Sequence, residues 1–368
     1  MTNIRARVSA VHRASVQLLI SDPQTQPQTQ PQTQSQRQSQ RHSQTDPHFP
    51  SLVHPHADPH HAPVTVDAML DHALLGDHDP LHQPTIGDWV TAQRRDDRLC
   101  VVAIEPRTSA LVRRAAGKTH RPQLLAANVD SAFVFSPLPT PPNVRRLARL
   151  VSLAIAGGVA PVVVLSRCDT VDLATRDHAL GSIAAFLPDI PLVATSAQTS
   201  DGVHALTPWC WPGATIVLLG PSGAGKSTLL NRLAGCDVME TGALRDDGAG
   251  RHTTTHRALF TLASGLTVID TPGLREVGVW ATPEATDALF ADIAELAARC
   301  RFRDCGHRSE PGCAVRDAVA RGEVDAERYA QWEELRREAA HALRSDAERR
   351  KRDRVGSLAI KRLPPKGY

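Results

Sequence analysis

The clearest chemical pattern in the chain runs from Gly220 to Thr228 (GPSGAGKST). It fits the phosphate-loop pattern G-x-x-x-x-G-K-S/T, in which backbone N–H groups surround phosphate oxygens. Lys226 would reach the β- and γ-phosphates, and the Ser227 hydroxyl would ligate Mg²⁺. The predicted phosphate contacts are Gly220, Pro221, Ser222, Gly223, Ala224, Gly225, Lys226, Ser227 and Thr228.

Two elements must flank such a loop. The apolar run at 214–219 (ATIVLL) predicts a buried strand before it, and 227–234 (STLLNRLA) predicts the helix after it. The N-terminus of that helix adds partial positive charge next to the phosphates. A glycine-rich turn with a chance lysine would not explain this strand and helix. The sequence therefore predicts a bound nucleoside triphosphate.

A second phosphate-side motif follows an apolar strand predicted at 266–270. It reads Asp270-Thr-Pro-Gly273: Asp270 would hold Mg²⁺ through water, and the N–H of Gly273 would meet the γ-phosphate. Between the two motifs lies 250–255 (GRHTTT), which we expect to act as a switch whose hydroxyls complete the metal shell. Which threonine would do so stays open, and a threonine run alone is more often a strand edge.

The motifs for reading a base stand in an unusual order. In an ordinary small GTPase they follow the DTPG motif, but nothing after Gly273 resembles them. Upstream, a strand predicted at 161–165 ends in Ser166-Arg167-Cys168-Asp169, and one at 190–194 ends in Thr195-Ser196-Ala197. Domain termini often lie close together on the surface, so such a reordering is tolerated. The order predicts a circularly permuted GTPase domain.

Guanine would be recognised mainly by Asp169, because a carboxylate accepts hydrogen bonds from the ring N–H and the exocyclic amine. A site built on those bonds rejects adenine by leaving polar groups unpaired. Ser166 can donate one hydrogen bond, and the stem of Arg167 can cover the ring. We therefore expect GTP rather than ATP. The predicted contacts in this region are Ser166, Arg167, Cys168, Asp169, Ser196 and Ala197.

Four soft metal ligands lie close together in the C-terminal part of the chain, with the spacing C-x4-C-x-H-x5-C: Cys300, Cys305, His307 and Cys313. Such a set suits one tetrahedral zinc ion without an open position, which makes the site structural. Four such residues within fourteen positions argue against the alternative, in which the three cysteines are free and the histidine is an ordinary surface residue. The chain has seven cysteines, an odd number with the others scattered, so disulfides are disfavoured and a cytoplasmic protein is expected.

The 368 residues leave room for two or three domains, and no apolar run reaches the length of a membrane span. Residues 4–20 predict paired strands, and a similar pattern resumes near Val66 or Met69. The Gln/Pro/His-rich stretch between them cannot bury an apolar core, so we expect a disordered insertion. From Leu335 to Tyr368 there are eleven Lys/Arg against four Asp/Glu. Such a run is usually a solvated face or a disordered tail. Because this one follows a predicted zinc site and the N-terminal strands suggest an OB-fold, contact with RNA phosphate is favoured.

Strands alternate with helices through the middle of the chain, which predicts a parallel sheet with helices on both faces. Besides those named above, we expect strands at 129–136 and 258–262 and helices at 143–156 and 173–187. A further helix is expected at 332–344, fraying into the basic tail.

The order of motifs resembles the ribosome small-subunit-dependent GTPase family (RsgA, also called YjeQ). Gly87-Asp-Trp-Val90 and Ile104-Glu-Pro-Arg107 are similar to its N-terminal OB-fold, a five-stranded barrel that binds nucleic acid. Ala126-Ala-Asn-Val-Asp130 is similar to the opening of its permuted GTPase domain, and 300–313 to its zinc motif. The resemblance covers nearly the whole chain except the insertion. The chain departs from the family's N/T-K-x-D motif, since Ser166 and Arg167 replace the first two residues.

The resemblance implies four regions: an OB-fold at 1–118 with the insertion at 21–66, a permuted GTPase domain at 119–283, a zinc domain at 284–335 and a basic helical tail at 336–368. It also implies a monomeric, cytoplasmic GTP hydrolase with Mg²⁺ and one structural zinc ion per chain. Its partners would be the small (30S) ribosomal subunit and its rRNA, with no membrane contact. The subunit would stimulate hydrolysis during late maturation, and the protein would leave afterwards.

Catalysis leaves two questions open. Small GTPases often place a glutamine after DxxG to orient water, but Leu274 stands there. The family shares this replacement, and His252 is then the candidate for positioning or deprotonating water, with Lys226, Ser227 and Asp270 carrying the rest. His252 could equally pack within its loop. A different class of function, a nucleotide-regulated RNA-binding module with negligible hydrolysis, also stays open. A P-loop kinase is a more distant alternative, because the sequence has no lid or acceptor-site signature.

Overall fold

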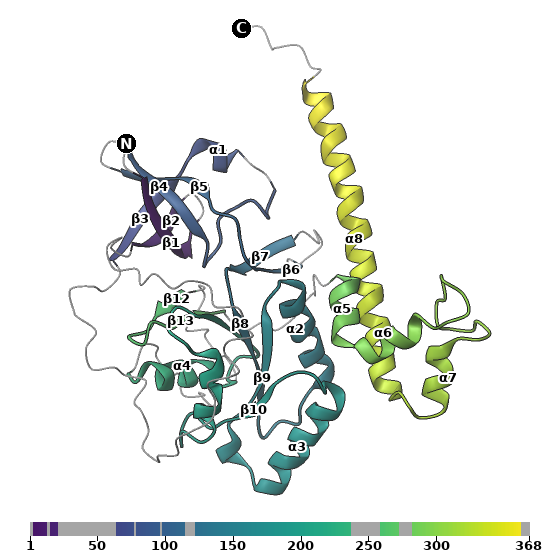
Figure 1. Ribbon diagram of the computed structural model, residues 1–368. Helices are drawn as coiled ribbons and strands as arrows, with labels where there is room; N and C mark the ends of the chain where they lie inside the picture. Colours follow the sequence, from purple (N-terminus) through teal and green to yellow (C-terminus); the bar gives the residue numbers. More distant parts are fainter. Residues whose placement is uncertain are drawn as a thin grey trace, which may run out of the picture.

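The computed structural model describes residues 3–12, 15–20, 64–76, 79–95, 98–114, 122–236, 258–271 and 282–361, the last range with side chains to residue 344. Within these ranges the chain forms a barrel, an α/β domain and a helical region (Figure 1). None of the helices there is long and apolar enough to cross a membrane. Most of the predicted insertion, the switch stretch with His252, and Gly273 lie outside the described residues.

The N-terminal strands close into a barrel in the order β1-β2-β3-β5-β4, which confirms the predicted OB-like fold. Along each strand, alternate residues are apolar and point inward, and they form one core. The strands are β1 (Asn3–Val11), β2 (Ser15–Ile20), β3 (Val64–Leu70), β4 (Trp89–Arg95) and β5 (Arg98–Ile104), with a short helix α1 (His72–Leu75) after β3.

The two sequence segments that resemble the OB-fold family meet in space. Arg107 donates to both carboxylate oxygens of the fully buried Asp88, through Nε at 2.7 Å and Nη2 at 2.8 Å. The same carboxylate accepts the Thr85 N–H at 2.8 Å. This bidentate pair fixes the loop before β4 against the chain after β5.

The α/β domain is a six-stranded sheet in the order β10-β9-β8-β11-β13-β12. Two separate core clusters show that both faces are covered, as predicted: α2 and α3 contribute to one, and α4 with the 3₁₀ segment Val203–Trp209 to the other. The elements are β8 (Ser131–Pro137), α2 (Val144–Ala156), β9 (Ala160–Ser166), α3 (Leu173–Phe186), β10 (Leu192–Ala194), β11 (Thr215–Leu219), α4 (Lys226–Ala234), β12 (Ala258–Thr261) and β13 (Thr267–Asp270). A two-stranded sheet of β6 (Ala110–Arg114) and β7 (Pro122–Ala127) precedes them.

One strand differs from the predicted parallel arrangement. β12 lies at the edge of the sheet and pairs antiparallel with β13, with Ala258 opposite Asp270. The chain between β12 and β13 is a tight turn, and parallel neighbours need a crossover of a dozen or more residues. The other strand pairs of the sheet are parallel, so their carboxyl ends meet at one edge.

The C-terminal region contains α5 (Pro283–Leu289), α6 (Ala291–Ala297), α7 (Ala314–Ala320) and α8 (Ala326–Lys361). α8 is longer at both ends than the helix predicted at 332–344, and it continues through the basic stretch. Its Ala, Glu and Arg content favours helix even where the apolar periodicity ends. The predicted boundary between residues 335 and 336 falls inside α8.

A buried arginine joins the barrel to the α/β domain. Arg7 on β1 is 9% exposed and donates from Nη2 to Thr215 Oγ1 at 2.8 Å and to the Asn128 carbonyl at 3.1 Å. Burial lowers the pKa of Arg7 to about 10, while the charge of Asp130 opposes that shift. Thr215 is the first residue of β11, so the barrel is bonded to the strand that leads into the phosphate loop.

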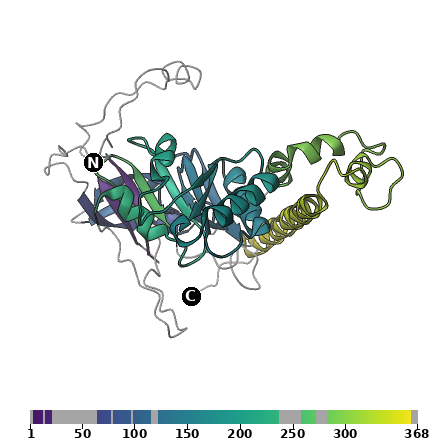
Figure 2. The same ribbon diagram turned by 90° about the horizontal axis from the view of Figure 1, so that it is seen from below.

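The helical region is attached to the other side of the α/β domain, as Figure 2 shows. Arg149 on α2 donates to Glu334 at 2.7 Å and to the two carboxylate oxygens of Glu338 at 2.5 and 2.9 Å. These ion pairs, with the packing of α5 against α2 and of α5 against α8, hold α8 against the domain.

We expect Arg149→Ala to lower the free energy of unfolding by about 1–2 kcal/mol, because it leaves two half-buried carboxylates unpaired. Urea unfolding followed by circular dichroism would measure the change. Arg145→Ala is the matched control, since Arg145 joins the same two helices through a more exposed pair with Glu327. Equal losses in the two variants would contradict a special role for Arg149.

Candidate functional site

The phosphate loop lies between β11 and α4 at the carboxyl edge of the sheet, as predicted. A Cβ on Gly220 would lie 2.8 Å from the Cβ of Phe135, so the loop approaches β8 too closely for another side chain. Lys226 is 8% exposed, and its Nζ donates to the carbonyls of Pro221 at 2.8 Å and Gly220 at 3.3 Å. The lysine therefore lies across the loop in which phosphate oxygens would be bound.

Asp270 ends β13, next to the phosphate-loop strand in the sheet. It is 4% exposed, and its Oδ1 has no hydrogen-bond partner among the described residues. Burial raises the pKa of Asp270 and lowers the pKa of Lys226, and each charge opposes the shift of the other. A buried carboxylate oxygen without a donor fits a cation, so the residues present suit a metal ion here.

The two loops predicted to bind the base come together beside the phosphate loop. Ser196 Oγ donates to Asp169 Oδ1 at 2.5 Å, and the Cys168 N–H donates to the Thr195 carbonyl at 3.2 Å. These loops follow β9 and β10, which are parallel neighbours. The fold thus brings Asp169 and Ser196 together over a sequence separation of 27 residues.

Ser166 contacts the phosphate loop, and Arg167 lies close to it. The Ser166 hydroxyl donates to the Ala224 carbonyl at 2.8 Å in a buried position. Arg167 has a left-handed backbone (φ 60°), and its Cγ would lie 3.9 Å from a Cβ on Gly225. Ser166, one of the two residues that depart from the family motif, therefore links β9 to the loop after β11.

Sequence reasoning missed two arginines near this site. Arg232 on α4 donates to the backbone carbonyls of Ala197 and Gln198, and the charge of Arg146 on α2 lowers the pKa of Lys226, after the larger effect of burial. No motif marks either residue, because an arginine on a helix surface is ordinary in sequence. The predicted roles of His252 and Gly273 lie outside the described residues.

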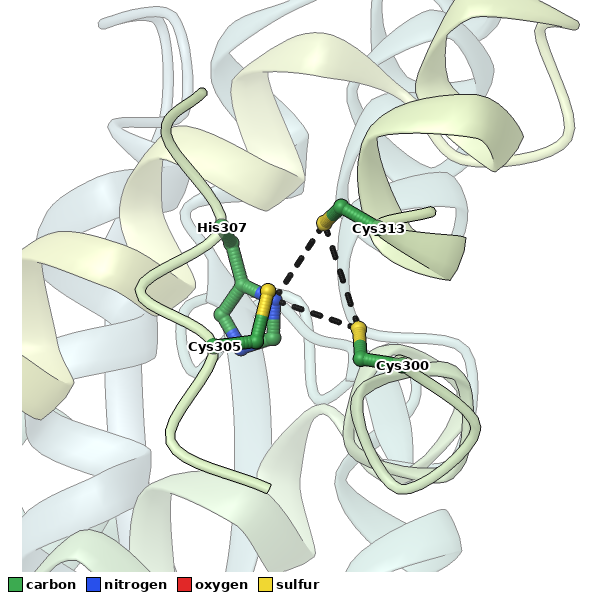
Figure 3. Close-up of side chains that lie close together, drawn as sticks. All are labelled: Cys300, Cys305, His307 and Cys313. Carbon is green, nitrogen blue, oxygen red and sulfur yellow. Dashed lines mark hydrogen bonds between the residues drawn. The ribbon is translucent and has the colours of Figure 1, made fainter. Parts of the chain in front are cut away.

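The three cysteines and the histidine predicted to bind a metal lie close together in space (Figure 3). Their ligand atoms all lie within 4.8 Å of one another. His307 Nδ1 is 3.6 Å from Cys300 Sγ and 3.5 Å from Cys313 Sγ, and the two sulfurs are 3.9 Å apart. Metal–sulfur bonds of about 2.3 Å give a tetrahedron with S···S edges of about 3.8 Å. The side chains thus fit a tetrahedral metal ion.

Neighbouring groups hold the histidine in place. Its backbone is left-handed (φ 58°), and its carbonyl accepts the Tyr329 hydroxyl at 2.8 Å. Its ring lies 5.3 Å from the Trp332 ring on α8. Burial, followed by the charge of Arg336, lowers the pKa of His307, which favours the neutral imidazole that ligates metals.

The loop between Cys305 and Cys313 is organised by a carboxylate. Glu310 accepts the N–H groups of Gly306 and Arg308 at 2.9 Å and that of Ser309 at 3.0 Å. A hydrogen bond from its own backbone N–H, followed by those from Ser309, Arg308 and Gly306, lowers the pKa of Glu310 to about 2. The charged carboxylate shapes the loop that carries His307.

Comparison with known proteins agrees with this arrangement. The family model RsgA GTPase matches residues 104–280. A protein of Opitutus terrae named small ribosomal subunit biogenesis GTPase RsgA is 45% identical over 273 residues, covering 71% of this chain and 74% of that protein. Two solved structures share the fold at 20% identity and cover 92% of this chain. They are YjeQ from Thermotoga maritima (TM-score 0.58, 99% of that chain) and YloQ, a circularly permuted GTPase (TM-score 0.57, 96% of that chain).

Proposed function

This chain belongs to the RsgA family of GTPases, and we propose that it hydrolyses GTP on the maturing small (30S) ribosomal subunit and leaves after hydrolysis. The observation that carries the proposal is the junction of the phosphate loop with the permuted base motifs. Ser166 bonds to Ala224, and Ser196 bonds to Asp169. The same edge of the sheet would thus offer groups for phosphates and for a guanine base.

Each group has a distinct role in this proposal. Backbone N–H groups of the phosphate loop and Lys226 bind the phosphates and stabilise the charge that develops during transfer to water. Asp169 accepts from the guanine ring N–H and the exocyclic amine. His252, outside the described residues, would orient or deprotonate the water.

Two metal ions belong to the proposal. Mg²⁺ would be held by Ser227 and by Asp270, whose Oδ1 lacks a donor among the described residues, and it would neutralise charge on the β- and γ-phosphates. Zinc would occupy the Cys₃His cluster, because thiolate and imidazole in a closed tetrahedral set suit Zn²⁺. The protein would act as a monomer in the cytoplasm, where reduced thiols remain available to the metal.

Contact with rRNA is supported by a basic hollow beside the metal cluster. Its volume is about 660 Å³, and it lies between α7 and α8, lined by Arg308, Arg316, Arg337, Tyr329 and Glu333 among others. Arg308 pairs with Glu333 at 3.3 Å, whereas Arg316 and Arg337 form no ion pair with a described residue. Two arginines that form no ion pair with a described residue suit a phosphodiester.

We expect the double variant Arg316→Gln/Arg337→Gln to bind small subunits about tenfold more weakly at 0.15 M salt and to reduce the slope of log Kd against log salt by about two. Filter binding over a salt series would measure both. Arg321→Gln is the control, because Arg321 is exposed and already paired with Glu323. An unchanged slope would show that neither arginine meets phosphate.

The proposed function is tested by GTP hydrolysis in steady state, with and without purified small subunits and with ATP as competitor. Strong stimulation that ATP does not suppress is the expected result. Subunit binding without stimulation would favour the alternative, a nucleotide-regulated RNA-binding module with negligible hydrolysis. Hydrolysis of ATP in place of GTP would overturn the guanine assignment.

A further inference from the structure

One arginine that belongs to neither of the two predicted base-binding motifs donates hydrogen bonds to the loop after β10. Arg232 lies in the last turn of α4, with an exposed side chain. Its Nε donates to the Ala197 carbonyl and its Nη2 to the Gln198 carbonyl, both at 2.9 Å. A single guanidinium therefore binds two consecutive peptide groups of the loop after β10.

The internal bonds of this loop set its shape and connect it to Asp169. Ser196 Oγ donates to Asp169 at 2.5 Å and accepts the Thr199 N–H at 3.2 Å, and the Ser196 N–H donates to the Asp201 carbonyl at 2.8 Å. These contacts make the loop and the Asp169 carboxylate one unit. The Ser166–Ala224 bond joins β9 to the phosphate loop, and Arg232 adds a direct contact between α4 and the loop after β10.

The serine at the start of the base motif makes this contact more important. An asparagine amide carries two hydrogens and can bond to two acceptors, but a hydroxyl has one. The Ser166 hydrogen is donated to Ala224 in the phosphate loop. Reading of the base therefore depends on Asp169 and the Ser196–Ala197 loop, so their placement has to be accurate.

We propose that Arg232 is a positioning residue for guanine recognition, which fixes the Ser196–Ala197 loop and, through Ser196, the Asp169 carboxylate relative to the phosphate-loop helix. In a trans peptide the carbonyl and the N–H point in opposite directions. Holding the carbonyls of Ala197 and Gln198 toward α4 turns the N–H groups of the next residues away from it. This inference rests on the proposed guanine site.

The test compares two substitutions in the full-length protein with Mg²⁺ present. Arg232→Met keeps the long stem without donors, and Arg232→Lys keeps the charge but replaces the two-pronged guanidinium with a single ammonium. Dissociation constants are measured by titration calorimetry for GDP, for IDP, which lacks the 2-amino group, and for ADP. Steady-state hydrolysis of GTP gives kcat and KM separately.

We expect Arg232→Met to weaken GDP binding about tenfold, as for the loss of one well-oriented hydrogen bond, and IDP binding less. The ratio of GDP to IDP affinity then falls, KM for GTP rises, and kcat at saturation stays unchanged. Arg232→Lys should lie between wild type and Arg232→Met. Because that variant keeps a charged side chain, it carries the test if Arg232→Met melts at a lower temperature.

Equal weakening of GDP and IDP, or no change in either, would overturn the role of Arg232. Wild-type protein that binds GDP, IDP and ADP equally would instead overturn the proposed guanine site, and the inference with it. Arg299→Met is the control, because Arg299 is exposed and far from α4 in sequence, and its only ion pair among the described residues is a 4.0 Å contact with Glu295. It should leave all three affinities unchanged.

Discussion

Replacing Lys226 by alanine is expected to lower kcat for GTP hydrolysis by about 10²–10³-fold, the loss typical of removing one donor that stabilises transition-state charge. The structure gives the reason, since Lys226 is buried at the phosphate loop and its charge lies close enough to Asp270 to affect the pKa of both groups. Subunit-stimulated hydrolysis, measured as phosphate release, checks the prediction.

Two controls make this result specific. Cys236→Ser changes an exposed residue shortly after α4 and should retain full activity. Lys226→Arg keeps the charge but not the compact ammonium, so it should recover only part of the rate. A Lys226→Ala protein with normal kcat would show that another cation carries the phosphate charge.

Cys313→Ala is expected to cost about 4 kcal/mol or more of stability in the C-terminal region, because it removes a metal ligand and with it a share of the metal binding energy. Cys313 is 2% exposed and also caps α7, where its sulfur accepts the Arg316 N–H at 3.5 Å. Metal analysis should give one zinc ion per wild-type chain and far less in the variant. Urea unfolding would measure the loss of stability.

The sheet should survive this substitution. The core cluster that includes residues of α4 contains no residue of the metal loop, so GDP binding should remain while small-subunit binding falls. Cys236→Ala provides the matched cysteine control and should leave the metal content unchanged. Full metal occupancy and normal stability in Cys313→Ala would contradict a structural site formed by these ligands.

Much of the fold could be predicted because its signals are local. The strand before the phosphate loop and the helix after it lie within a residue of their predicted bounds, since buried apolar runs and glycines mark them. The helix predicted at 143–156 is α2, which begins at Val144 with Asn143 as its N-cap. The metal cluster could be predicted because all its ligands lie within one short segment.

Other features depend on partners far away in the sequence. The antiparallel direction of β12 is an exception, because it follows from the short turn to β13, which is a local feature of the sequence. Arg149 and Glu338 are separated by 189 positions, and no pattern in either helix announces the pair. The same holds for Arg232 and the loop after β10. Contacts of this kind become visible only when the sheet order is known.

The order of strands also has a consequence for how the chain is made. Synthesis proceeds from the N-terminus, so β8, β9 and β10 are complete before β11 exists, although β11 is the direct neighbour of β8. Until Leu219 has left the ribosome, β8 presents an unpaired edge, which is a site for aggregation. The nascent protein also cannot be stabilised by nucleotide before Asp270 appears. The part of the sheet that carries Asp169 and Ser196 therefore stays without its neighbouring strand until β11 has been made.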